Sequence, residues 1–166
     1  MPKKLNIFLS DFASIVTAGR SSNSSTTKKA KGRSAELPDL RKWPDIEVVD
    51  ITQVTTEMLK RVWDDDTAGL FSKPVIEAHP AIADAYLNAI DTPMDLRTIE
   101  EDRVNVYSSI HMLQDDLILM FQNCCTFNGK DSDLGNMAVT QWEGINHKFV
   151  DVCKDLGILL PRHWNP

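Results

Sequence analysis

The sequence is poor in cysteine, glycine and proline, and it has no long hydrophobic run. Three cysteines among 166 residues, an odd number without a C-x-x-C pair, exclude a disulfide framework and argue against a zinc ribbon. We therefore expect reduced thiols and an intracellular protein. Seven glycines and eight prolines are too few for a collagen-like or proline-rich fibre. Because no apolar run approaches the ~18 residues that a transmembrane helix needs, we expect no membrane partner.

Positive charge is scarce beyond the first quarter of the chain. Residues 1–42 carry nine Lys or Arg and three Asp or Glu, whereas residues 43–166 carry nine and twenty-one. A nucleic-acid site must neutralise phosphates, so we expect no direct nucleic-acid binding by the folded domain. The acidity favours a basic partner, and the alternative is that it only maintains solubility.

Residues 1–42 are predicted to form a disordered or weakly ordered basic leader and linker. Six apolar side chains recur there at helical spacing: Leu5, Phe8, Leu9, Phe12, Ile15 and Val16. Asp11 interrupts this run, so a short amphipathic docking helix or an unfolded leader is favoured over a secretory signal. The Ser/Thr-rich stretch 21–27 cannot bury enough surface to fold. The basic cluster 28–33 indicates either a nuclear-import or polyanion-contacting patch or a merely solvated charge run.

Residues 43–160 are predicted to form an all-α domain, with residues 161–166 as a tail. Apolar residues recur there at steps of three and four, and no segment alternates with period two. The helix starts are predicted at Asp50, Asp95, Ser108 and either Ser132 or Asp133. Asp50 and Asp95 are residues of the type that caps free backbone amides, and Gly157 is a natural end for the last helix. Four such helices with short later links favour an antiparallel four-helix bundle.

The stretch from Ala68 to Pro93 is a long loop between the first and second predicted helices. It has about 26 residues, where two to eight are usual in bundles. It is also rich in apolar side chains, which water would not tolerate in an extended segment. We expect it to fold back over one end of the bundle, where it either carries function or is a lid that only seals the bundle end.

Three segments carry a family resemblance. They are Phe71-Ser72-Lys73-Pro74-Val75, the run from Tyr86 to Leu96 with its Pro-Met-Asp-Leu, and the run from Met120 to Asn128 with its Asn-Cys-x-x-Phe-Asn. In this order they resemble a bromodomain, the acetyl-lysine reader of chromatin proteins, over roughly residues 50–156. The resemblance implies a left-handed four-helix bundle with a binding pocket at one end, formed by the long first loop and the loop before the last helix.

Asn128 resembles the family's anchoring asparagine. An acetylated lysine ends in a neutral amide, whose carbonyl needs a hydrogen-bond donor in a dry site. Asn supplies an NH₂ donor without a charge to desolvate. The alternative is that Asn128, followed by Gly129, is an ordinary left-handed helix cap.

The resemblance assigns the rest of the pocket by position. Tyr86 matches a tyrosine that binds an ordered water, Phe71 the end of an aromatic shelf, and Val75 a pocket wall. Phe127 matches the aromatic residue before the anchor, and Leu134 the gatekeeper. Each of these also has a purely structural interpretation as core or loop packing. The shelf reads Gly69-Leu70-Phe71, so a glycine replaces the family's tryptophan; Trp63 is interpreted as a core residue instead.

The predicted function is that of a nuclear acetyl-lysine reader, which binds acetylated histone or other chromatin-protein tails without a cofactor or metal. One alternative is a helical docking module with a degenerate acetyl-lysine pocket. Another is an enzyme, since His111 and Asp115 lie four apart on a helix and could pair. No catalytic triad, glycine-rich phosphate loop or metal-ligand spacing accompanies them, so binding is favoured over catalysis.

Overall fold

The structure is a computed structural model that describes residues 37, 41–46 and 50–164, so the predicted leader lies almost wholly outside it. The α-helices are α2 (Ile51–Asp65), α3 (Val75–Ala78), α4 (Ala83–Ala89), α5 (Leu96–Thr98), α6 (Ile110–Asn128) and α7 (Asp133–Asp155). Two 3₁₀ turns, η1 (Pro80–Ile82) and η3 (Val104–Val106), and a π-helical turn, η2 (Ile99–Arg103), complete the order. These described residues contain no strand, and the predicted all-α fold class is confirmed.

The helix starts follow the capping residues that the sequence predicts. Asp50 accepts hydrogen bonds from the backbone amides of Thr52 and Gln53, at 2.9 and 3.3 Å. Asp95 caps α5 by accepting from Thr98 N at 3.1 Å. Ser132 accepts from Gly135 N at 3.0 Å at the start of α7. Such bonds satisfy amides that lack a partner in the first helical turn.

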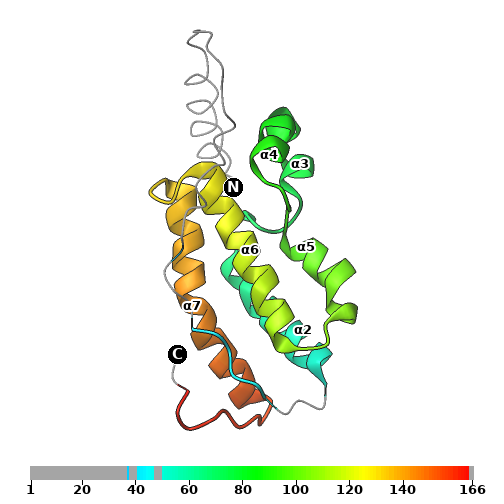
Figure 1. Cartoon of the computed structure of the whole chain (residues 1–166), viewed down its shortest axis with the longest axis vertical. Helices are drawn as coiled ribbons and strands as arrows, with labels where there is room; N and C mark the ends of the chain where they lie inside the picture. The colour runs from blue at the N-terminus through cyan, green and yellow to red at the C-terminus, as the bar shows by residue number, and fades with distance from the viewer. Residues whose placement is uncertain (1–36, 38–40, 47–49, 165–166) are drawn as a thin grey trace, which may run out of the picture. The chain divides into compact units, whose positions relative to one another are not determined.

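The long helices α2, α6 and α7 pack side by side (Figure 1). Their inward faces form the core, which is contributed chiefly by Val54, Met58, Val62, Leu113, Leu117, Phe121, Ile145 and Phe149. The Phe121 ring meets Phe71 edge-on at 5.1 Å and Trp142 at 6.3 Å. Trp63 is half-buried at the surface of α2, so its interpretation as a core residue is wrong.

The segment before α2 packs on the bundle through Trp43. Its ring stacks on Phe149 with centroids 4.3 Å apart, and its indole N–H donates to Asn146 Oδ1 at 2.9 Å. Its backbone amide donates to Gln114 Oε1 at 2.9 Å. After α7 the Trp164 ring meets Phe149 edge-on at 5.8 Å. The packed residues therefore extend past the predicted range 43–160 at its C-terminal side.

His111 has a partner other than the one considered from the sequence. Its Nε2 lies 2.8 Å from Asp45 Oδ1, in the segment before α2. The suggested pair with Asp115 on the same helix is therefore wrong. The interaction ties the segment that carries Trp43 to α6.

The stretch from Ala68 to Pro93 is folded rather than extended, since it contains α3, η1 and α4. The Asp66 carboxylate accepts from the amides of Leu70 and Phe71 at 2.8 and 2.9 Å. At its far end Asn123 Nδ2 donates to Thr92 O at 2.8 Å. Both ends of the loop are thus fixed to the long helices.

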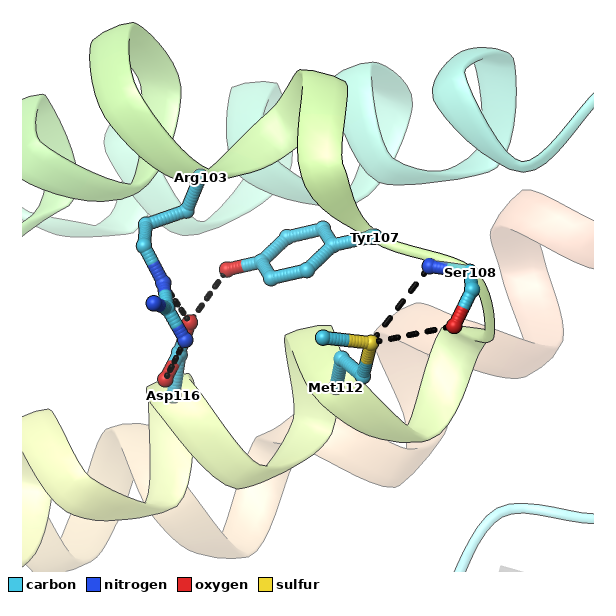
Figure 2. A network of polar contacts seen from close by, with 5 residues as sticks. All are labelled: Arg103, Tyr107, Ser108, Met112 and Asp116. Carbon is cyan, nitrogen blue, oxygen red and sulfur yellow. Dashed lines mark hydrogen bonds and ion pairs between the residues drawn. The ribbon is translucent and has the colours of Figure 1, made fainter.

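A buried carboxylate connects the π-helical turn η2 to α6 (Figure 2). Asp116 accepts from Arg103 Nε at 2.9 Å and from the Tyr107 hydroxyl at 2.6 Å. Burial, followed by the hydrogen bond to Asp116, raises the pKa of Tyr107 above its ordinary value. The phenol therefore stays a neutral donor at physiological pH.

Replacing Tyr107 by Phe is expected to destabilise the domain by about 1 kcal/mol, because a buried hydrogen bond to a charged acceptor is lost while Arg103 still pairs with Asp116. Urea unfolding measures this change. Exposed Ser108 lies next to Tyr107 in the chain, and its replacement by Ala is the control, expected to change stability by less than about 0.5 kcal/mol. Equal stabilities of the two variants would contradict the role given to Tyr107.

Candidate functional site

The C-terminal end of α6 meets α4 through two aromatic rings. Tyr86 on α4 and Phe127 on α6 are packed edge-to-face, with centroids 5.1 Å apart. Tyr86 is 4% exposed, and Phe127 and Asn128 are half-buried. The fold thus brings three residues of the predicted site to one end of the bundle.

The side chain of Asn128 is held at the last turn of α6. Its Nδ2 donates to Cys124 O at 3.0 Å. Nδ2 also donates to Cys124 Sγ at 3.5 Å, a weak acceptor that a ligand carbonyl can replace. The left-handed cap interpretation of Asn128 is wrong, because the residue with the positive φ, 87°, is Gly129. Among the described residues only glycines have a positive φ.

The other predicted positions surround this end to different degrees. Leu134 is buried at the start of α7, and its carbonyl accepts from Cys124 Sγ at 3.5 Å. Phe71 is buried against Phe121. Val75 is half-buried at the start of α3, which packs on the helix that carries Tyr86. Phe71 and Leu134 are therefore part of the buried core.

Two ionisable side chains at this end, Tyr86 and Cys124, stay neutral at physiological pH. Burial raises the pKa of Tyr86 to about 12, and burial raises the pKa of the Cys124 thiol to about 12. Burial also raises the pKa of Asp66, although two backbone amides oppose this effect. A neutral phenol and a neutral thiol beside a carboxamide donor suit a neutral polar ligand better than an ion.

Sequence reasoning missed Cys124 as a site residue. It did not connect Cys124 with Asn128, although Asn128 Nδ2 lies 3.5 Å from Cys124 Sγ. Cys124 is four residues before Asn128, and residues at this spacing share one helix face. That spacing was the signal that could have identified it.

Comparison with known proteins identifies the family of the chain. The family model for the bromodomain matches residues 55–140, which is more than half of the chain. The chain belongs to the bromodomain family. Bromodomains are acetyl-lysine-binding modules of chromatin proteins rather than enzymes.

The matches with curated relatives cover only a small part of each relative's length. Bromodomain-containing protein bet-1 of Caenorhabditis elegans is 36% identical over 86 residues, which cover 51% of this chain and 10% of that protein. The SWR1 complex bromodomain subunit bdf1 of Schizosaccharomyces pombe is 33% identical over 108 residues, which cover 59% of this chain and 18% of that protein. The chain therefore spans less than a fifth of the length of these curated relatives.

A solved structure supports the fold. The crystal structure of a hypothetical bromodomain from Trypanosoma brucei, in complex with bromosporine, is 24% identical and has a TM-score of 0.53. The match covers 69% of this chain and 94% of that one. In the part of the chain that the structure describes, no helix is long and apolar enough to cross a membrane, and no cluster of His, Cys, Asp and Glu could hold a metal ion.

The three thiols of this bromodomain are expected to react slowly with a disulfide reagent such as DTNB. All three are buried, and a rise in the pKa of Cys124 from 9.0 to about 12 lowers its thiolate fraction at neutral pH about a thousandfold. Burial likewise raises the pKa of Cys125 and that of Cys153, the latter to about 11. In urea, all three thiols should be labelled completely in the time in which the native protein reacts little. Rapid labelling of the native protein would contradict the burial of these thiols.

Proposed function

We propose that this bromodomain is a nuclear reader that binds acetylated lysine in Lys/Arg-rich chromatin-protein tails, histone tails above all. The observation that supports the proposal most is the carboxamide of Asn128. It is half-buried at the end of α6, one donor is fixed to Cys124 O at 3.0 Å, and a neutral phenol lies on the adjoining helix. The bond from Nδ2 to Cys124 Sγ, at 3.5 Å, is weak, and the acetyl carbonyl would replace the sulfur as acceptor.

Discrimination against unmodified lysine comes from desolvation. Acetylation removes the charge of the lysine side chain. An ammonium that left water for this neutral site would cost several kcal/mol even after relaxation. The acetyl amide loses far less hydration, and its bond to Asn128 contributes about 0.5–1.5 kcal/mol net. The site therefore favours the modified lysine chiefly by rejecting the unmodified one.

The remaining site residues are assigned supporting roles. Tyr86 would place a water between its hydroxyl and the acetyl oxygen, with its ring held by Phe127 at 5.1 Å. Val75 and Phe71 would provide apolar contact to the acetyl group from the loop side. Leu134 would flank the pocket from the first turn of α7.

The reduced shelf supports a weak single-site affinity. Gly69 has a φ of +68°, a conformation that glycine adopts readily and other residues rarely. A tryptophan at this position would be strained. The backbone conformation of the loop therefore explains why a glycine stands here and why the shelf lacks its ring. Contact beyond the acetyl group is accordingly small, and neighbouring modules or marks would strengthen binding.

Titration calorimetry with paired histone-tail peptides, acetylated and unmodified, tests the proposal. We expect heat of binding with the acetylated peptide and much weaker binding of the unmodified one. Equal affinities would refute acetyl-lysine reading and favour the docking-module alternative.

A further inference from the structure

A groove of about 700 Å³ lies between α2 and the chain segment after α5. Thr56, Lys60, Trp63 and Asp64 line it from α2, and Glu100 and Val104 from η2 and η3. Every residue named for the acetyl-lysine site lies outside this lining. The groove is therefore a separate feature of the domain.

Trp63 is the distinctive side chain of the groove. The chain has four tryptophans, and Trp43 and Trp142 are only 2% and 4% exposed. The indole N–H of Trp164 donates to Lys42 O at 3.0 Å. Trp63 is half-buried in the groove wall, and an accessible indole face is the best aromatic surface for a cation.

Two carboxylates lie at the same end of the groove as Trp63. Leu96 N donates to Phe71 O at 2.8 Å, which fixes the start of α5 beside the loop that follows α2. The chain then runs back along α2, and η3 packs on that helix. Glu100, four residues after Leu96, thus comes near the end of α2 that holds Trp63 and Asp64.

The groove has a net negative lining. In the described part of the chain neither Asp64 nor Glu100 takes part in an ion pair, whereas the adjacent Asp65 pairs with Lys148 at 2.5 Å. Lys60 adds one positive charge, one helical turn away from Asp64. A cation between the two carboxylates would complement this charge.

We infer that this groove binds an unmodified Lys- or Arg-rich segment of a protein partner. One cationic side chain lies over the Trp63 indole, and the carboxylates of Asp64 and Glu100 flank it. The apolar stem of a Lys or Arg side chain packs along Val104 while its head reaches the charges. Because the groove accepts the charged form of lysine, its specificity is opposite to that of the acetyl-lysine site.

Heteronuclear NMR of the isotope-labelled full chain tests this inference through the indole N–H resonances. The probe is the peptide Gly-Lys-Gly-Arg-Gly-Lys with both termini blocked, titrated at low salt, where surface charges are least screened. The Trp63→Phe variant assigns the Trp63 resonance by its disappearance. We expect that resonance to shift with saturation, while the Trp43 and Trp142 resonances stay in place.

Variants separate the groove from the general acidity of the domain. The pair Asp64→Asn with Glu100→Gln should weaken binding about three- to tenfold, since each exposed ion pair contributes a few tenths to one kcal/mol. The pair Glu143→Gln with Asp151→Asn removes the same charge from exposed positions on α7 and should leave the affinity nearly unchanged. Lys60→Gln should strengthen binding about twofold.

The outcomes distinguish this inference from acetyl-lysine reading. The Asn128→Ala variant should bind the basic peptide like the parent, whatever it does to acetylated peptides. Equal weakening by the α2 and α7 charge pairs would overturn the inference, as would an equal response to a Gly-Glu peptide. A Trp63 resonance that shifts with protein concentration alone would overturn it too, because a second copy of the chain would then occupy the groove.

Discussion

The Asn128→Ala variant is expected to lose about 10- to 100-fold in affinity for acetylated peptides, because the acetyl carbonyl would be buried without its donor. Its melting temperature should stay within about 3 °C of the parent value. The variant loses the hydrogen bond from Nδ2 to Cys124 O, but alanine is the better helix former at the last position of α6. These two effects on folding oppose each other, so binding and stability should separate.

Calorimetry and thermal unfolding measure the two quantities on the same preparation. Asn136→Ala is the matched control, because Asn136 is exposed on α7 and its side chain makes only a 3.5 Å bond to Asp131 O. The control should bind like the parent. Retained binding by Asn128→Ala would refute the anchoring role, and a large loss of stability would show that Asn128 chiefly supports the fold.

The second large effect is expected from Gly135→Ala, which should destabilise the domain by about 1–3 kcal/mol and weaken acetyl-peptide binding. A Cβ atom at Gly135 would lie 2.7 Å from Lys130 O and closer still to Gly129 O. Both obstacles are backbone atoms of the turn that follows Asn128. That turn must move to admit the methyl group, and the movement would displace the carboxamide of Asn128.

Gly144→Ala provides the control within the same helix. A Cβ atom there would meet only the Lys148 Nζ atom, at 3.1 Å, and a flexible amine can move aside. Since glycine in a helix interior costs about 1 kcal/mol relative to alanine, this variant should gain stability. If the two substitutions had the same effect in urea unfolding, the close approach of α7 to the turn would be contradicted.

Local signals predicted the helix boundaries well, because the residues concerned act on their own neighbours. Asp50, Asp95 and Ser132 bond to amides two or three residues away. Asn123 braces the backbone of the long loop through its bond to Thr92 O, 31 residues away. For the pocket, the position of Asn128 at the end of α6 could be anticipated, and its proximity to Cys124 follows from helical spacing.

Contacts between distant parts of the chain could not be predicted in this way. Trp43 finds Gln114 and Asn146 across 71 and 103 residues, and nothing in its local sequence specifies either partner. The same holds for Arg103 and Asp116, which meet because a π-helical turn points toward α6. Trp63 follows the apolar period of α2, yet it lies at the rim, where periodicity cannot tell a core face from a groove wall.

The hydrogen bond from the Trp164 indole to Lys42 O, at 3.0 Å, joins the segment before α2 to the segment after α7. Trp43 contacts α6 at Gln114, about 20 Å along the helix axis from Asn128. Tension applied to both flanking segments would thus act on this contact and not on the end of the bundle that holds Asn128. Mechanical load on the flanking chain would therefore leave the geometry around Asn128 undisturbed.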